Sequence, residues 1–310
     1  MESANAKPTI RILHHMARSG GTIISRCLGS MQGVTLLSEV SPVPYREITP
    51  ATIGSCIQFH PILQAYKWHE LFTVEEAEML TVQTSLDYAT LIELVHHRCA
   101  ARGQTLLLRD WSHADFTAHP PFPAPTYKLS IVEALQDRFD IRHTASVRHP
   151  IDQWLSLRRL AVIDGHVSLA QYLTGYRHFA EKCVEMEFVR YDDLVDSPTT
   201  EIQKLCQRLD LQYDPSFETE WVKYSKVTGD MNQNRAETAI KKLPRRDFES
   251  ELLQQCEANA DYWKSLELLG FAHPEGVAQS APAAIAAPNF LSHVSTTEQM
   301  SSMFQQETQS

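Results

Sequence analysis

Apolar positions along this chain follow two alternating patterns. Short runs rich in Ile, Leu, Val and Thr are separated by longer stretches in which apolar residues recur every three or four positions. The first pattern is typical of buried strands and the second of amphipathic helices. The predicted strands are residues 9–14, 34–37, 105–108, 144–147 and 187–191. Because strands that alternate with helices form parallel sheets, the pattern predicts a three-layer α/β/α domain with a central parallel sheet.

Helical spacing also predicts two helices between the second and third strands, at residues 73–80 and 84–102. A last amphipathic helix is expected over residues 252–269. Ser197 precedes Pro198, and this pair is typical of a helix start, with Ser197 as the capping residue.

A basic, glycine-containing loop follows the first predicted strand. Arg18 and Ser19 precede Gly20 and Gly21, and a helical pattern begins at Thr22. Glycines let backbone N–H groups approach a ligand closely, and a helix start presents unpaired N–H donors and a positive dipole. The loop is therefore predicted to bind phosphate or sulfate, although a plain strand-to-helix turn also uses glycines. The lysine of the Walker pattern is absent, which argues against an ordinary ATPase.

A second candidate anion site follows the fourth predicted strand. Arg148 stands where this strand ends, and Pro150 suits the first turn of a helix. Ser156 lies about two helical turns beyond Arg148. Both side chains could reach one anion, although an arginine before a proline helix is often a plain surface charge.

These two segments, with a third at residues 188–198 that contains Tyr191, resemble the sulfotransferases that use 3′-phosphoadenosine 5′-phosphosulfate (PAPS). The three segments occur in the family's order, and the resemblance covers residues 10–270. It implies a P-loop NTPase-like fold and a loop from Arg18 to Thr22 that binds the 5′-phosphosulfate. It also implies that Arg148 and Ser156 bind the 3′-phosphate, and that Tyr191 lies near the adenosine.

The chain departs from the cytosolic members of this family at the first loop. Arg18 stands where they carry a lysine, Gly21 where they carry a threonine, and Ile23 where they carry a tryptophan. An arginine at this place is more similar to the carbohydrate and bacterial members. Because a guanidinium does not lose its proton, we expect Arg18 to act by positioning and charge stabilisation.

The family's catalytic base stands near the end of an interior strand. Here residues 105–108 are followed by Asp110 and His113, and we expect His113 to be the base because an imidazole accepts an alcohol proton near neutral pH. Asp110 is the second candidate. His14 and His15 lie in the first strand, so at most one of them points toward the site.

In the family, a basic loop in the region of residues 221–246 closes over the donor and contacts its 3′-phosphate. The resemblance makes Arg235, Lys241 and Arg245 candidates for this contact, with an exposed basic surface as the alternative.

Metal and nucleic-acid functions are not favoured by the sequence. The pairs His14-His15 and His96-His97 are adjacent, and neither HExxH nor CxxC occurs, so no metal is expected. The six scattered cysteines are consistent with reduced thiols in a cytosolic protein. The net charge of −10 disfavours a nucleic-acid duplex as partner.

The expected organisation is a flexible N-terminus (residues 1–8), a sulfotransferase-like domain (residues 9–271) and a disordered tail (residues 272–310). The tail has no lysine or arginine and is rich in Ala, Ser, Pro and Gln. No signal peptide or membrane segment is evident, so we expect a cytoplasmic protein.

The sequence therefore predicts an enzyme that moves a sulfuryl group from PAPS to a hydroxyl or amine of a small-molecule acceptor, leaving adenosine 3′,5′-bisphosphate. The alternatives are a nucleotide-dependent kinase and a non-catalytic nucleotide-binding or interaction module. The sequence leaves open the acceptor's identity and the oligomeric state.

Overall fold

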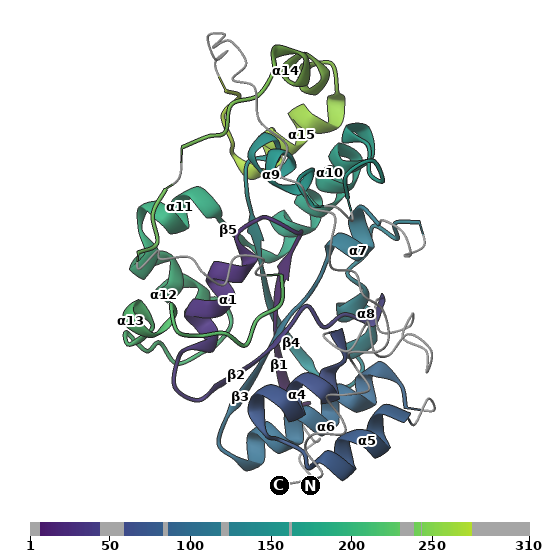
Figure 1. Ribbon diagram of the computed structural model, residues 1–310, viewed down its shortest axis with the longest axis vertical. Coiled ribbons are helices and arrows are strands. Elements are labelled where there is room, and N and C mark those ends of the chain that lie inside the picture. The colour runs from purple at the N-terminus through teal and green to yellow at the C-terminus, as the bar shows by residue number, and fades with distance from the viewer. Residues whose placement is uncertain are drawn as a thin grey trace, which may run out of the picture. The chain divides into compact units, whose positions relative to one another are not determined.

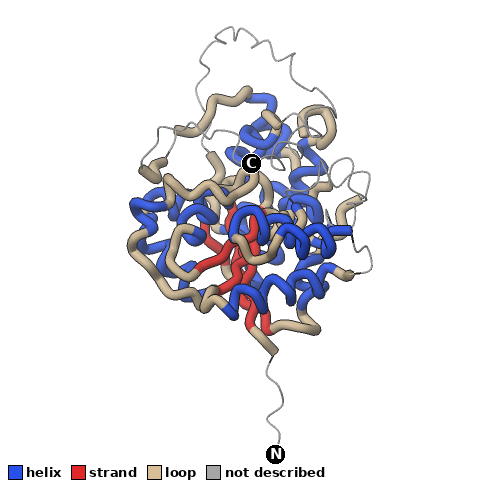
Figure 2. The backbone as a smooth tube through the Cα atoms, turned by 60° about the horizontal axis from the view of Figure 1, so that its bottom comes forward, coloured by secondary structure: helices blue, strands red, loops and turns tan. Residues whose placement is uncertain are grey.

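The chain is described by a computed structural model, which covers residues 7–43, 59–82, 86–118, 124–160, 163–229, 239–242 and 244–274. Its centre is a sheet of five parallel strands in the order β2-β3-β1-β4-β5. Helices cover both faces of this sheet (Figures 1 and 2). The predicted α/β/α architecture with a central parallel sheet is confirmed.

The elements are, in chain order, β1 (Thr9–His15), α1 (Gly21–Gly29), β2 (Val34–Ser38), α4 (Pro61–His69), α5 (Val74–Val82), α6 (Tyr88–Ala101), β3 (Thr105–Arg109), α7 (His113–Phe116), α8 (Ser130–Leu135), β4 (Asp140–Val147), α9 (Pro150–Leu157), α10 (Leu169–Met186), β5 (Phe188–Arg190), α11 (Tyr191–Asp196), α12 (Pro198–Arg208), α13 (Phe217–Glu220), α14 (Ser250–Glu257) and α15 (Ala260–Leu269).

Alternate residues of β1 divide the core between the two faces of the sheet. Ile10 and Ile12 pack with α4, α6 and α8, whereas Leu13 packs with α1, α12 and α13. All three side chains are fully buried, so this strand is covered on both sides. Burial on both faces is the reason that parallel strands are apolar throughout, which is the pattern that identified them in the sequence.

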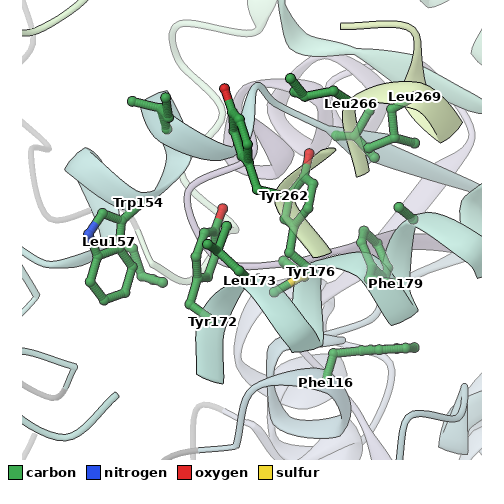
Figure 3. Packing of buried hydrophobic residues seen from close by; sticks show 14 of the residues in the cluster. Phe116, Trp154, Leu157, Tyr172, Leu173, Tyr176, Phe179, Tyr262, Leu266 and Leu269 are labelled. Carbon is green, nitrogen blue, oxygen red and sulfur yellow. The ribbon is translucent and has the colours of Figure 1, made fainter. Parts of the chain in front are cut away.

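A third part of the core lies around α9, α10 and α15, where aromatic side chains pack together (Figure 3). Two tyrosines of α10 use their hydroxyls to fix the segment that enters α9. Tyr172 donates to the carbonyl oxygen of Pro150 at 3.0 Å, and Tyr176 donates to that of Arg148 at 2.5 Å. This part of the core thereby fixes the backbone of Arg148, one of the predicted anion-binding residues.

The structure corrects several predicted helices. The region predicted as one helix over residues 252–269 is two helices, α14 and α15, because the Asn259 side chain caps α15 by accepting from the N–H groups of Asp261 and Tyr262. α4 was not predicted. Ser197 stands at the N-cap of α12 as expected, but its side chain makes no capping hydrogen bond there.

Candidate functional site

The loop between β1 and α1, which the sequence predicts to bind an anion, turns directly into the start of a helix. Gly20 is the N-cap of α1 with a φ of +96°, and Arg18 beside it also has a positive φ of 71°. Among the described residues, no side chain caps α1, and its first turn contains no acidic residue. The start of α1 therefore has neither a capping side chain nor a carboxylate that would compete with a bound anion.

Both glycines of this loop are required by close neighbours. A Cβ on Gly20 would lie 2.4 Å from Cδ2 of Tyr191, and a Cβ on Gly21 would lie 2.7 Å from Cγ of His15. Ser19 is fully buried, and its hydroxyl is 3.0 Å from that of Ser146 at the end of β4. The loop is thus held by contacts with Tyr191, His15 and Ser146.

The two predicted anion segments meet in the structure. Nε of Arg18 donates to Oγ of Ser156 in α9 at 2.9 Å, although the two residues are 138 positions apart in the chain. The Arg148 guanidinium lies over the ring of Tyr191, with its Cζ 4.8 Å from the ring centroid. The residues assigned by resemblance to the two ends of one donor molecule therefore lie at the carboxyl ends of neighbouring strands, where such sheets bind ligands.

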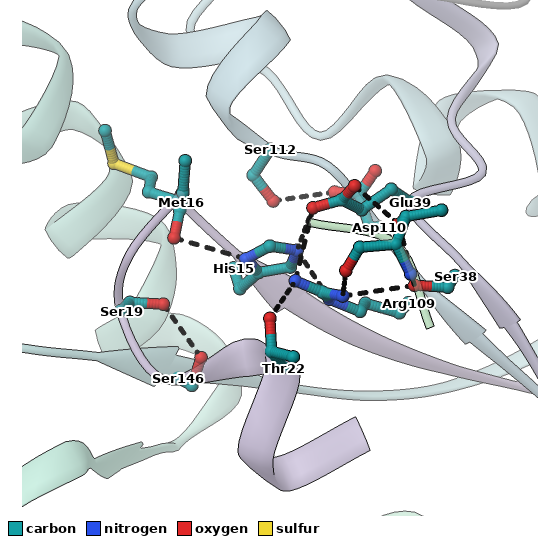
Figure 4. A network of polar contacts seen from close by, with 12 residues as sticks. His15, Met16, Ser19, Thr22, Ser38, Glu39, Arg109, Asp110, Ser112 and Ser146 are labelled. Atoms are coloured by element: carbon teal, nitrogen blue, oxygen red, sulfur yellow. Dashed lines mark hydrogen bonds and ion pairs between the residues drawn. The ribbon is translucent and has the colours of Figure 1, made fainter. Parts of the chain in front are cut away.

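Next to the loop is a buried polar cluster that the sequence analysis did not predict, which we call the Arg109 cluster (Figure 4). The Arg109 guanidinium is 2 % exposed and uses all five of its N–H groups. Its acceptors are Nε2 of His15, Oγ of Ser38, the carbonyl oxygen of Thr228, Oγ1 of Thr22 and Oε1 of Glu39, at distances of 2.8 to 3.2 Å. Because Thr22 belongs to the first turn of α1, the cluster brings a second fixed cation to the anion loop.

Glu39 balances the charge of Arg109. Its Oε2 accepts from the Thr228 hydroxyl at 2.5 Å, and its Oε1 accepts from Arg109 at 3.2 Å. Glu39 directly follows β2. A charged residue directly after a buried strand is a pattern that could have marked Glu39 as a candidate in the sequence. Nothing in the sequence near Thr228 indicated that this segment returns to the end of β2.

The hydrogen bonds of His15 define its tautomer. Nε2 accepts from Nε of Arg109 at 2.8 Å, so Nδ1 carries the proton and donates to the carbonyl oxygen of Met16 at 3.2 Å. Burial, and then the Arg109 charge, hold the pKa of His15 well below its usual value. His15 is therefore neutral, and its ring lies between Gly21 and the Arg109 guanidinium.

The two candidate bases have different surroundings. His113 is the first residue of α7 and is fully buried, and its ring contacts the Thr117 hydroxyl, with Nδ1 at 2.6 Å. Asp110 follows Arg109 and lies on the other side of the sheet, because successive side chains of a strand alternate.

Asp110 belongs to a separate buried chain of polar groups. Its Oδ2 accepts from the Ser112 hydroxyl at 2.7 Å and contacts Nδ1 of His14 at 2.9 Å. Nε2 of His14 in turn lies 3.1 Å from Nδ1 of His143. As expected, His14 and His15 point to opposite faces, and only His15 lies beside the loop. Asp110 is therefore engaged with Ser112 and His14, on the opposite face from His15.

The three basic candidates from the region of residues 221–246 differ in their surroundings. Arg235 lies outside the described residues. Lys241 is exposed, and Arg245 forms a bidentate ion pair with Asp152 in the first turn of α9, with Nη2 to Oδ2 at 2.8 Å. This pair places Arg245 next to the helix that carries Ser156.

No set of three or more His, Cys, Asp or Glu side chains in the described ranges is grouped as a metal site would be. Within the same ranges, every helix is too short or too polar to cross a bilayer.

No protein-family model and no curated protein matches this sequence. The structure, in contrast, is similar to solved sulfotransferase domains. The domain from the Synechococcus PCC 7002 olefin synthase matches with a TM-score of 0.61 and 16% identity, over 88% of this chain and 99% of that chain. The domain from the curacin biosynthetic pathway matches with a TM-score of 0.60 and 13% identity, over 87% of this chain and 100% of that chain. The chain therefore has the fold of these sulfotransferase domains.

Proposed function

We propose that this chain is a sulfotransferase that moves a sulfuryl group from PAPS to a hydroxyl or amine of a small-molecule acceptor. The observation that carries the proposal is the direct contact between the two anion segments, the Arg18 to Ser156 hydrogen bond of 2.9 Å. A donor with anionic groups at both ends of one nucleoside needs two cationic sites close together. ATP has no 3′-phosphate and would leave the second of these sites without a partner.

The residues present fit such a donor. The N-terminus of α1 and Arg18 supply N–H donors and charge for the 5′-end. Arg148 supplies charged N–H donors, and Ser156 a hydroxyl donor, for the 3′-phosphate. The bound donor supplies an activated sulfuryl group, whose bond to the 5′-phosphate oxygen breaks as a bond from sulfur to the acceptor oxygen or nitrogen forms.

In this proposal the protein positions the reactants and handles one proton. His113 accepts the proton of the acceptor group, while Arg18 and the α1 N–H groups stabilise the charge that develops on the 5′-phosphate oxygen. Glu39 already accepts hydrogen bonds from Arg109 and Thr228, so we assign it to holding Arg109. Arg109 then adds fixed positive charge beside Thr22.

Calorimetry with adenosine 3′,5′-bisphosphate, AMP and ATP tests the proposal. We expect the bisphosphate to bind at least about tenfold more tightly than AMP, because charge-assisted hydrogen bonds to the 3′-phosphate contribute about 1.5–3 kcal/mol. Arg148→Ala should remove this preference and leave AMP binding nearly unchanged. Tighter binding of Mg²⁺-ATP with hydrolysis would instead identify a kinase or ATPase.

Turnover is tested with labelled PAPS and a panel of alcohols, phenols and amines. Labelled product that depends on His113 would support the enzyme. Bisphosphate binding without transfer to any acceptor of the panel would favour a non-catalytic nucleotide-binding module.

A further inference from the structure

Tyr191 occupies the space between the two predicted anion segments. It is the first residue of α11, follows β5 and is 9 % exposed. One edge of its ring rests against the anion loop, because a Cβ on Gly20 would lie 2.4 Å from Cδ2 and 3.1 Å from Cε2 of this ring. The ring therefore cannot move toward α1 without displacing the Gly20 turn.

The face of the same ring carries the guanidinium of Arg148. Cζ of Arg148 lies 4.8 Å from the ring centroid, which is within the range of a cation–π contact. The Arg148 backbone is held separately, because its carbonyl oxygen accepts from the buried Tyr176 hydroxyl. Among the described residues, no carboxylate pairs with this guanidinium, so its direction is set by the contact with the Tyr191 ring.

We infer that Tyr191 is a positioning residue: its ring holds the Arg148 guanidinium ready for the 3′-phosphate of the donor while its edge rests on the Gly20 turn. The inference rests on the proposed function, and it gives Tyr191 a task other than contact with the adenosine. A planar ring is required because a guanidinium stacks on an aromatic face, whereas an aliphatic side chain offers no such contact.

The test measures one ratio, the Kd for AMP divided by the Kd for adenosine 3′,5′-bisphosphate, by calorimetry. Tyr191→Met keeps side-chain volume beside Gly20 but removes the ring. We expect it to lower the ratio from about tenfold or more to within about threefold, because Arg148 loses its direction. Tyr191→Phe keeps the ring and should retain the wild-type ratio.

A double-mutant cycle shows whether Tyr191 acts through Arg148. If it does, Tyr191→Met combined with Arg148→Ala has the same ratio as Arg148→Ala alone. Tyr213→Met, in which the lost ring packs on Phe217, is the matched control and should leave the ratio unchanged. Thermal unfolding confirms that each variant is folded, and Tyr191→Leu carries the test if Tyr191→Met is not.

Two results would overturn the inference. An equal loss of affinity for both nucleotides in Tyr191→Met would mean that Tyr191 contacts the shared nucleoside. Additive effects in the cycle would mean that it does not act through Arg148. Failure of the proposed function is distinguishable, because the wild-type protein would then show no preference for the bisphosphate.

Discussion

Arg18 and His113 have different tasks in the proposed reaction, and single substitutions separate them. Arg18→Lys keeps the positive charge beside α1, so it should retain measurable turnover and change mainly the affinity for the donor. His113→Ala should lower the turnover rate by about 10²–10⁴, as loss of a general base does, with bisphosphate binding near the wild-type value. The measurement is a rate assay with labelled PAPS beside calorimetry.

Asp110→Asn is the companion variant for this prediction. Asp110 lies on the other side of the sheet and is engaged with Ser112 and His14, so the variant should bind donor and turn over more than His113→Ala. The assignment of His113 is wrong if His113→Ala is active while Asp110→Asn binds donor without turnover.

A second residue-scale prediction concerns the balance of charge at Arg109. The side chains of Arg109 and Glu39 are 2 % and 10 % exposed, so Arg109→Met leaves an uncompensated carboxylate in the interior. We expect the free energy of unfolding in urea to fall by about 3–5 kcal/mol. Arg138→Met removes an arginine that also pairs with carboxylates but has 33 % of its side chain exposed, and it should cost less than about 1 kcal/mol. Equal costs would show that the cluster is not a buried charge network.

Candidate residues that stand out through their neighbours in the chain could be selected from the sequence. Arg18 and Gly20 were selected because a strand, a loop and a helix follow one another directly, and the structure has β1 and α1 in this order. The contact of Arg18 with Ser156 was not predicted, because a hydrogen bond over 138 positions has no local signal. The contacts of Thr228 with Glu39 and Arg109 were not predicted either, because they also join distant parts of the chain.

The anion loop as an element depends on the absence of a side chain at Gly20. Gly20→Ala introduces a Cβ at a φ of +96° and 2.4 Å from the Tyr191 ring. Gly33→Ala is the matched control, because Gly33 has a φ of +77° but open space around it. Gly33→Ala should cost about 1–2 kcal/mol of backbone strain, and Gly20→Ala about 1–3 kcal/mol more for the displaced ring.

Urea unfolding measures this difference, and calorimetry with the bisphosphate follows its effect on the site. Gly20→Ala should also weaken binding, since the turn and Tyr191 cannot both keep their places. If the two variants lose the same stability and bind equally well, the packing of Gly20 on Tyr191 has no consequence for the loop.

Elements differ in how well the sequence predicted them. Four of the five strands were placed within about two residues at each end, because burial on both faces makes them largely apolar. β4 begins at Asp140, four residues before the predicted start, because its first four residues are only partly buried and do not form an apolar run. Helix ends were harder to place: Asn259 divides the last predicted helix by offering its side chain to two backbone N–H groups. Tyr191 was predicted as the end of a strand and instead begins α11.

At the scale of the whole molecule, several buried histidines connect stability to pH. Burial lowers the pKa values of His60, His143 and His149 to about 4. A histidine whose pKa is lower in the folded chain stabilises the fold above its unfolded pKa of about 6.5. That stabilisation is lost as the pH falls through about 4. Asp115 changes the stability of the fold with pH in the opposite direction, because burial and the charge of Asp110 raise its pKa to about 6.

The histidines outnumber Asp115, so the thermal unfolding midpoint should fall as the pH is lowered from 7 to 4.5. His149 shows the cause: its Nδ1 accepts from the N–H of Ile151 while its Nε2 donates to the carbonyl oxygen of Ala272, so protonation breaks the first bond. His149→Asn can still cap α9 without titrating and should flatten the pH dependence. The exposed His166, replaced by Gln, is the control that should leave it unchanged. A wild-type midpoint that does not fall over this range would contradict the prediction, because the buried imidazoles would then accept protons without loss of stability.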